Sequence, residues 1–264
     1  MNKSKELDQF YTNNKIAESC MDELNKNYKL DNYFLLEPSA GTGSFSDLFH
    51  KNSLAIDIDP KKPYMKKIDF LGLSINAFNH KNVFTIGNPP FGKNSSLAIK
   101  FFNKSAEFSD YIAFVVPKTF KKASLTNKLS LDFHLDMEKD IPLDSFIFEG
   151  KKYSVPCVFQ VWKKMDVKRE PIYTKSSTEL FEFTTKEDAD FAIRRVGGLA
   201  GKVLEEFAEY SESSNYFIKT KRSKRLLTKK IRSVYEDLNI LAKNSAGNPS
   251  LSKHELITTL ERSN

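Results

Sequence analysis

The chain contains 264 residues, of which 40% are hydrophobic and 12% aromatic, and it carries a formal net charge of +7. This length and apolar content exclude a disordered chain and allow one α/β core of ordinary size with an appendage. The two cysteines, Cys20 and Cys157, stand far apart without metal-ligand spacing, so we expect neither a metal site nor a secreted disulfide framework.

Short apolar runs alternate with helix-compatible stretches over the first 165 residues. This alternation is typical of a parallel sheet covered on both faces. Strands are predicted at 33–36, 54–58, 83–86 and 111–116, each closed by Gly, Pro, Asp or Asn. The predicted class is therefore α/β, with a Rossmann-like and mostly parallel sheet.

Two further features complete the predicted first domain. A helix capped by Ser95 or Ser96 is expected to extend through Phe108, because its apolar residues share one broad face. Runs at 145–148 and 157–162 flank a turn-rich segment and predict an antiparallel hairpin at one edge of the sheet.

The alternation stops after Lys164, which places a domain boundary near 165–172. We expect a catalytic domain over 1–165 and a small basic C-terminal extension over 166–264, which ends in a capped helix after Ser250.

A glycine-rich loop, EPSAGTGSF from Glu37 to Phe45, directly follows the first predicted strand. Glycine lacks a Cβ atom, so Gly41 and Gly43 let the backbone turn tightly and approach a bound nucleoside closely. The third glycine of a dinucleotide-binding fingerprint is absent, and an acid precedes the loop. The pattern favours a ligand whose hydroxyl and ammonium groups need acceptors over a pyrophosphate.

Acidic residues follow the next predicted strand. Asp57 stands where an acid binds the ribose diol in a doubly wound sheet, whereas Asp59, before a proline, is interpreted as a turn residue. Asp69 can accept a hydrogen bond from an adenine amino group, and the adjacent Phe70 can pack on the adenine face.

The most specific motif is the tetrapeptide Asn88-Pro89-Pro90-Phe91, which follows the strand predicted at 83–86. Its prolines make the backbone rigid and leave carbonyl oxygens, together with the Asn88 amide oxygen, as acceptors. Two acceptors can hold the hydrogens of an amino group and turn its lone pair toward an electrophilic methyl group. The Phe91 ring can stack on a base that has left its helix.

These motifs, in this order, resemble the adenine-N6 family of amino-group DNA methyltransferases. The resemblance covers roughly residues 8 to 163 and adds an N-terminal Phe-Tyr-Thr segment to the motifs above. It implies S-adenosylmethionine as cofactor, a methyltransferase sheet, and catalysis by Asn88, Pro89, Pro90 and Phe91. The cofactor-binding residues that it implies are Phe10, Tyr11, Thr12, Glu37, Ser39, Gly41, Gly43, Phe45, Asp57, Asp69 and Phe70.

Basic residues concentrate toward the C-terminus, where Lys219 to Arg232 contains no acid and follows the aromatic pair Tyr216-Phe217. Such a segment is typical of phosphate contact and predicts a nucleic acid as partner. The resemblance implies that this partner is DNA, with RNA as a further possibility. The predicted nucleic-acid-binding residues are Arg194, Arg195, Lys221, Arg222, Lys224, Arg225, Lys229 and Lys230.

The sequence leaves three alternatives open: adenine methylation in RNA, methylation of a protein glutamine, and a non-catalytic DNA-binding module. The glutamine enzymes usually end the tetrapeptide in Tyr rather than Phe, and an inactive module would have a changed Asn88 or a broken glycine-rich loop. No apolar run is long enough to span a membrane, so we expect a soluble cytoplasmic protein.

Overall fold

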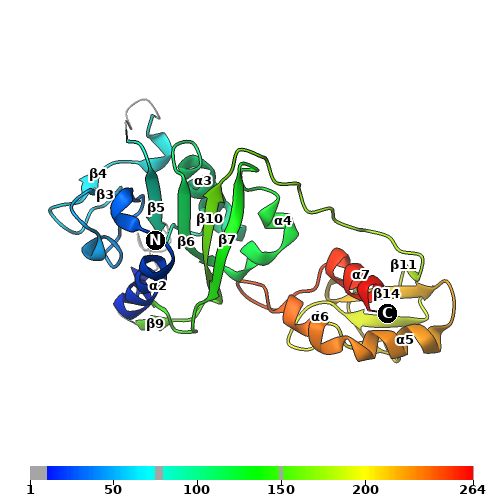
Figure 1. The fold of residues 1–264 in the computed structure, drawn as a ribbon. Helices are drawn as coiled ribbons and strands as arrows, with labels where there is room; N and C mark the ends of the chain where they lie inside the picture. The colour runs from blue at the N-terminus through cyan, green and yellow to red at the C-terminus, as the bar shows by residue number, and fades with distance from the viewer. Residues whose placement is uncertain (1–10, 75–79, 149–150, 264) are drawn as a thin grey trace. The chain divides into compact units, whose positions relative to one another are not determined.

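The computed structural model describes residues 11–74, 80–148 and 151–263. The chain forms two compact units, Met1–Ile172 (unit 1) and Tyr173–Asn264 (unit 2) (Figure 1). Each unit has its own hydrophobic core.

Unit 1 contains a seven-stranded sheet with the strand order β4-β3-β2-β5-β6-β10-β7. The first five of these strands are parallel to one another, whereas β10 is antiparallel to both β6 and β7. The bounds are β2 (Phe34–Glu37), β3 (Ser53–Asp57), β4 (Lys66–Lys67), β5 (Val83–Gly87), β6 (Tyr111–Pro117), β7 (Phe133–Asp140) and β10 (Cys157–Lys164). The predicted fold class, a mostly parallel Rossmann-like sheet with an antiparallel edge, is confirmed.

Helices cover both faces of this sheet. Helix α2 (Asn14–Asn27) lies against the face that carries Met137 and Lys139, and Glu23 pairs with Lys139 at 3.1 Å. Helix α3 (Ser96–Ser105) packs Phe102 on Trp162, with ring centroids 5.5 Å apart. Buried on both faces, β5 and β6 consist almost entirely of apolar residues, as their sequences require.

The predicted helix after the Asn-Pro-Pro-Phe motif is shorter than expected. Helix α3 ends at Ser105, and Ser95 precedes it in a left-handed conformation without a side-chain capping bond. The prediction that Ser95 or Ser96 caps a helix through Phe108 is therefore wrong. After Ser105 the chain leaves the helix in turns, in which the Phe108 and Ser109 N–H groups both donate to the Ser105 carbonyl oxygen.

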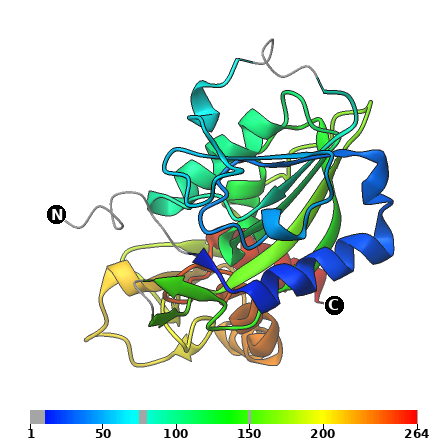
Figure 2. The same cartoon turned by 90° about the vertical axis from the view of Figure 1, so that its left-hand side faces the viewer.

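The hairpin predicted between 145–148 and 157–162 is wrong, because these two runs do not pair with each other. Strand β10 pairs with β7, while β8 (Phe146–Phe148) and β9 (Lys151–Tyr153) form their own hairpin. Strand β1 (Tyr11–Thr12) adds to β8, so that a three-stranded antiparallel sheet stands beside the large one (Figure 2). The sequence pattern missed β7, because an edge strand that is exposed on one side carries charged residues along its length.

Short helical turns join these strands. They are η1 (Leu30–Asn32), η2 (Ser46–Leu48), η3 (Phe70–Gly72), η5 (Lys93–Ser95), η6 (Lys118–Lys121) and α4 (Ala123–Thr126). Near the end of unit 1, Arg169 holds the chain against β7 and the segment that follows α4. Arg169 donates to the carbonyl oxygens of Leu129 and Phe133 at 3.0 Å each, and its guanidinium lies 5.6 Å from the Trp162 ring centroid.

Unit 2 is a second fold rather than a simple extension. Its four-stranded antiparallel sheet has the order β11-β14-β12-β13. Its elements are β11 (Phe181–Phe183), β12 (Phe191–Arg194), β13 (Val203–Leu204), η7 (Glu212–Ser214), β14 (Asn215–Thr220), α5 (Lys224–Ser233), α6 (Tyr235–Ala242) and α7 (Lys253–Arg262). The predicted capped terminal helix is confirmed, since Ser252 and Glu255 form a capping box at the start of α7.

Candidate active site

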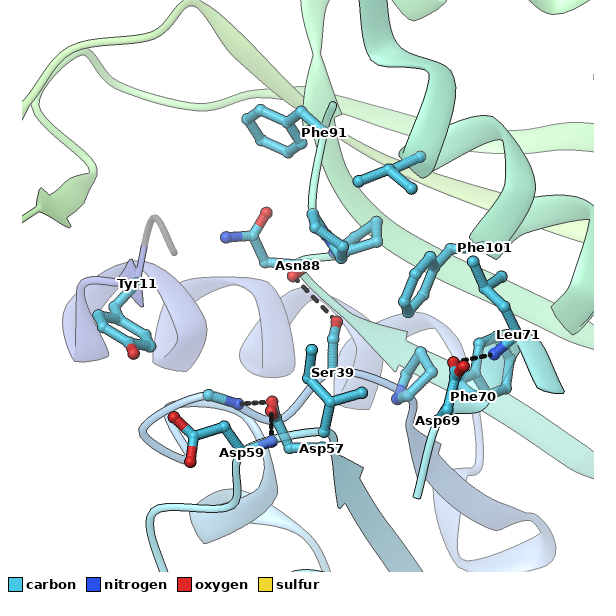
Figure 3. A pocket seen from close by; sticks show the side chains of 16 residues that line it. Tyr11, Ser39, Asp57, Asp59, Asp69, Phe70, Leu71, Asn88, Phe91 and Phe101 are labelled. Atoms are coloured by element: carbon cyan, nitrogen blue, oxygen red, sulfur yellow. Dashed lines mark hydrogen bonds between the residues drawn. The ribbon is translucent and has the colours of Figure 1, made fainter. Parts of the chain in front are cut away.

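The carboxyl ends of β2, β3 and β5 meet at one edge of the large sheet, where the chain order reverses beside β2. In an open α/β sheet, ligands bind at such a switch point. A cavity of about 220 Å³ lies there (Figure 3). It is lined by six of the predicted cofactor residues, Tyr11, Ser39, Gly41, Asp57, Asp69 and Phe70, and by all of Asn88, Pro89, Pro90 and Phe91.

Gly41 forms the floor of the cavity beside an aromatic ring. It has a φ of +51°, and a Cβ atom there would lie 2.9 Å from Cδ1 of Tyr11. Only glycine combines this conformation with so close an approach. Burial raises the pKa of the Tyr11 hydroxyl above its ordinary value of 10.0, so this hydroxyl keeps its proton at neutral pH.

Asp57 fastens the glycine-rich loop to the end of β3. Its Oδ2 accepts from the backbone N–H of Gly41 and its Oδ1 from that of Asp59, each at 2.8 Å. Two backbone donors thus set the orientation of a carboxylate that also faces the cavity. Asp59 occupies the predicted turn, pairs with Lys61 at 2.6 Å, and lines the cavity too.

Four predicted cofactor residues do not line the cavity: Thr12, Glu37, Gly43 and Phe45. Glu37 is 2% exposed and accepts from the Ser46 N–H at 2.8 Å. Burial raises the pKa of Glu37 well above its ordinary value of 4.5, so this carboxyl favours its neutral form.

The other three support the loop in different ways. Phe45 lies in the core, and a Cβ atom at Gly43 would lie 2.6 Å from the Tyr64 hydroxyl oxygen. The Thr12 carbonyl oxygen accepts from Ser44 Oγ at 2.7 Å. Among the described residues, the buried Thr12 Oγ1 has no hydrogen-bond partner. The predicted Phe10 lies outside the described residues.

Asp69 and Phe70 form the opposite wall. Asp69 caps η3 by accepting from the Leu71 N–H at 3.1 Å, and Phe70 is buried against Phe101, with ring centroids 5.2 Å apart. Figure 3 shows this wall across the cavity from Tyr11. Phe101 and Leu97 belong to α3 and also line the cavity. From the sequence, Phe101 and Leu97 were predicted only to lie on the apolar face of a helix. No motif indicates which part of that face reaches a ligand.

The Asn-Pro-Pro-Phe motif follows β5 and forms the roof. Ser39 Oγ donates to the Asn88 carbonyl oxygen at 3.3 Å, which joins the loops after β2 and β5. The Asn88 amide lies below the Phe91 ring in Figure 3. Phe91 is 8% exposed and meets Phe146 edge to face, with centroids 6.1 Å apart and an interplanar angle of 87°.

A strained turn connects this motif to α3. Gly92, Asn94 and Ser95 all have positive φ values, of 68°, 54° and 62°. A non-glycine residue in this region costs of order 1–3 kcal/mol and persists only where the surroundings impose it. Ser95 is buried and its Oγ lies 3.2 Å from Thr119 Oγ1, after β6. No residue pattern signals this strain beyond the single glycine.

The predicted nucleic-acid-binding residues all belong to unit 2. Lys224, Arg225 and Lys229 lie on the exposed side of α5, and Lys230 is half-buried. Lys221 and Arg222 precede the helix and are exposed. The remaining two residues, Arg194 and Arg195, interact with other residues of unit 2. Arg194 Nε donates to the Val196 carbonyl at 2.9 Å, and the Arg195 guanidinium lies 5.4 Å from the Tyr216 ring centroid.

The described residues contain no helix long and apolar enough to cross a bilayer. Within the same residues, no three His, Cys, Asp or Glu side chains gather in a way that could hold a metal ion.

Comparisons with known proteins return structural similarities alone. No family model and no curated protein sequence matches the chain. A Pyrococcus horikoshii protein, provisionally described as an RNA methyltransferase, is 17% identical over 62% of this chain and 90% of its own, with a TM-score of 0.47. A Thermoplasma acidophilum protein is 16% identical over 63% and 100%, with a TM-score of 0.42. The 23S rRNA methyltransferase ErmE is 14% identical over 63% and 73%, with a TM-score of 0.39.

Proposed function

We propose that the protein transfers a methyl group from S-adenosylmethionine to the N6 amino group of adenine in DNA. The observation that carries this proposal is that one cavity is lined by both the Asn-Pro-Pro-Phe motif and the acids and rings predicted for the cofactor. A transfer reaction needs its two binding sites to share a space from which water is excluded.

The chemistry of the lining residues fits the cofactor. Asp57 offers carboxylate oxygens to ribose hydroxyls, and two backbone donors already orient it. Asp69 provides an acceptor for an amino group beside the apolar rings of Phe70 and Phe101, which suits an adenine ring. When bound, the cofactor supplies an activated methyl group on sulfur, so the protein need only orient the acceptor.

The motif residues would orient the amine. The lone pair of an adenine amino group is delocalised into the ring, which makes the amine a weak nucleophile. Asn88 Oδ1 and the Pro89 carbonyl oxygen would accept its two hydrogens, which localises the lone pair on nitrogen and directs it toward the electrophilic methyl group. The Phe91 ring would stack on the purine, which offsets part of the few kcal/mol that unstacking a base costs. Transfer would form the N6–carbon bond and break the carbon–sulfur bond, whose electron pair would go to sulfur, and N6 would lose a proton to solvent.

Phosphate contact is proposed for unit 2. The exposed side of α5 carries Lys224, Arg225 and Lys229. Arg225 and Lys229 are four residues apart and share one helix face, which suits phosphate contact. Because phosphates attract cations without regard to sequence, this face would supply affinity rather than base specificity.

The test is transfer of labelled methyl groups to unmethylated DNA, to RNA and to protein, followed by identification of the modified group. We expect N6-methyladenine in DNA, and an Asn88→Ala variant to lose roughly 100-fold or more in kcat while it still binds S-adenosylhomocysteine. Asn14→Ala, on the exposed start of α2, serves as the control and should retain full activity. Equal labelling by Asn88→Ala would refute the mechanism, and label in RNA or in a glutamine side chain would reassign the substrate.

A further inference from the structure

Phe146 connects the two halves of the candidate site without lining the cavity. It is fully buried and begins β8, a strand of the small sheet beside the large one. Phe146 therefore cannot touch a ligand in this cavity directly. Any effect it has on binding must act through its neighbours.

On one side, Phe146 supports the ring of the Asn-Pro-Pro-Phe motif. Its ring meets Phe91 at 87° with centroids 6.1 Å apart, an edge-to-face contact that restricts how the Phe91 ring can tilt. Phe91 is the aromatic residue of the motif, and it lines the cavity. A shift of Phe146 would therefore change the surface offered to a target base.

On the other side, Phe146 lies opposite Thr12 in the β1–β8 ladder. The ladder is extended by a hydrogen bond of 2.9 Å from the Asn13 N–H to the Ser145 carbonyl oxygen. Thr12 is tied in turn to the glycine-rich loop through Ser44 Oγ at 2.7 Å. Its neighbour Tyr11 packs on Gly41 in the cavity.

A continuous set of contacts thus runs from the glycine-rich loop through β1 and Phe146 to Phe91. We infer that Phe146 is a positioning residue that sets the Phe91 ring according to the position of the Tyr11–Thr12 segment, and so couples cofactor binding to target-base binding. This inference rests on the proposed function. It requires that cofactor and nucleic acid each bind more tightly in the presence of the other, since such coupling is reciprocal.

The test measures the dissociation constant of S-adenosylhomocysteine with and without saturating DNA of the kind that the wild type methylates. In the wild type we expect DNA to tighten this binding by about 10-fold, a usual size for coupling between sites. In Phe146→Leu we expect less than about 2-fold tightening and a KM for DNA raised about 10-fold. The affinity for S-adenosylhomocysteine alone should stay within about 2-fold of wild type, because the β1–β8 backbone pairing remains.

Phe133→Leu is the matched control. Phe133 is equally buried, in β7, and its ring contact is with Phe102 rather than with the motif. A merely structural role for Phe146 would make the two variants behave alike. Phe146→Met, which keeps more side-chain volume, covers the case in which the leucine variant folds poorly, and it should recover part of the coupling.

The outcomes separate this inference from the proposed function. Methyl transfer by the wild type together with undiminished coupling in Phe146→Leu and Phe146→Met overturns the role of Phe146 alone. Absence of coupling in an active wild type does the same. Absence of both cofactor binding and methyl transfer in the wild type overturns the proposed function, and this inference with it.

Discussion

The hydroxyl of Ser39 donates a hydrogen bond to the carbonyl oxygen of Asn88 over 3.3 Å, and this bond joins the loop after β2 to the loop after β5. The first loop carries some of the predicted cofactor residues, among them Gly41, and the second carries the predicted catalytic residues. Their relative position therefore depends in part on a single side chain.

We expect Ser39→Ala to lower kcat about 5-fold, because a hydrogen bond of this kind contributes about 1 kcal/mol. Binding of S-adenosylhomocysteine should change less than kcat does. Steady-state kinetics and calorimetry measure the two effects. Ser53→Ala is the control, since Ser53 Oγ also donates to a backbone carbonyl, that of His50 at 2.7 Å, outside the cavity. Equal kinetic losses in both variants would contradict the role given to Ser39.

Gly41→Ala should weaken cofactor binding by about 10-fold or more. The new Cβ would lie 2.9 Å from the Tyr11 ring, and the φ of +51° is strained for alanine. Calorimetric titration with S-adenosylhomocysteine measures the loss. Gly198→Ala is the control, because no described atom lies within 4 Å of a Cβ at that position. Unchanged affinity in Gly41→Ala would remove Gly41 and Tyr11 from the cofactor site.

Glu37→Gln should change how stability depends on pH. Because burial raises the pKa of Glu37, the folded protein retains a proton that the unfolded chain releases above about pH 4.5. The stabilising contribution of this carboxyl is complete below pH 4.5 and is lost as the pH rises toward the raised pKa. The glutamine cannot titrate, while its carbonyl oxygen can still accept from the Ser46 N–H.

The difference in unfolding free energy between Glu37→Gln and the wild type should therefore increase with pH above 4.5, by at most about 1.4 kcal/mol per pH unit. Urea titrations at several pH values measure it. Glu18→Gln, at an exposed position of α2, is the matched control for the loss of a carboxyl group. A pH-independent difference for Glu37→Gln would show that this carboxyl ionises freely in the folded protein.

Neutralising Lys224, Arg225, Lys229 and Lys230 should flatten the salt dependence of DNA binding. Each lost phosphate contact lowers the slope of log K against log salt by about 0.9 for duplex DNA. Affinity measured between low and moderate salt tests this. The matched control neutralises four exposed lysines of unit 1, namely Lys15, Lys26, Lys29 and Lys51. If the slope of log K against log salt falls only in the control, the phosphate contacts lie on unit 1 rather than on α5.

The strands of the parallel sheet could be predicted from the sequence to within one residue at most ends. For example, the run predicted at 83–86 is β5, Val83–Gly87. These strands are buried on both faces, so their apolar character is continuous and their ends are marked by turn residues. The strands of unit 2 were missed because they have two to six residues each and alternate with polar connections.

The candidate site could be predicted where its residues are adjacent in sequence. Asn88 to Phe91 and the glycine-rich loop form contiguous motifs, and they meet in one cavity. Residues whose position depends on packing could not be predicted. Phe101 reaches the cavity only because of how α3 packs. Glu37 does not line the cavity, because its side chain is buried and accepts from the Ser46 N–H. The roles of these residues in binding and catalysis stay predictions.

Both outer strands of the large sheet carry charge. Strand β4 consists of two exposed lysines, Lys66 and Lys67, and β7 ends in the sequence Met-Glu-Lys-Asp. Unpaired backbone groups at such margins can recruit a strand from another molecule, and charged side chains oppose that approach. The charges on β4 and β7 therefore oppose edge-to-edge pairing of the large sheet with a second molecule.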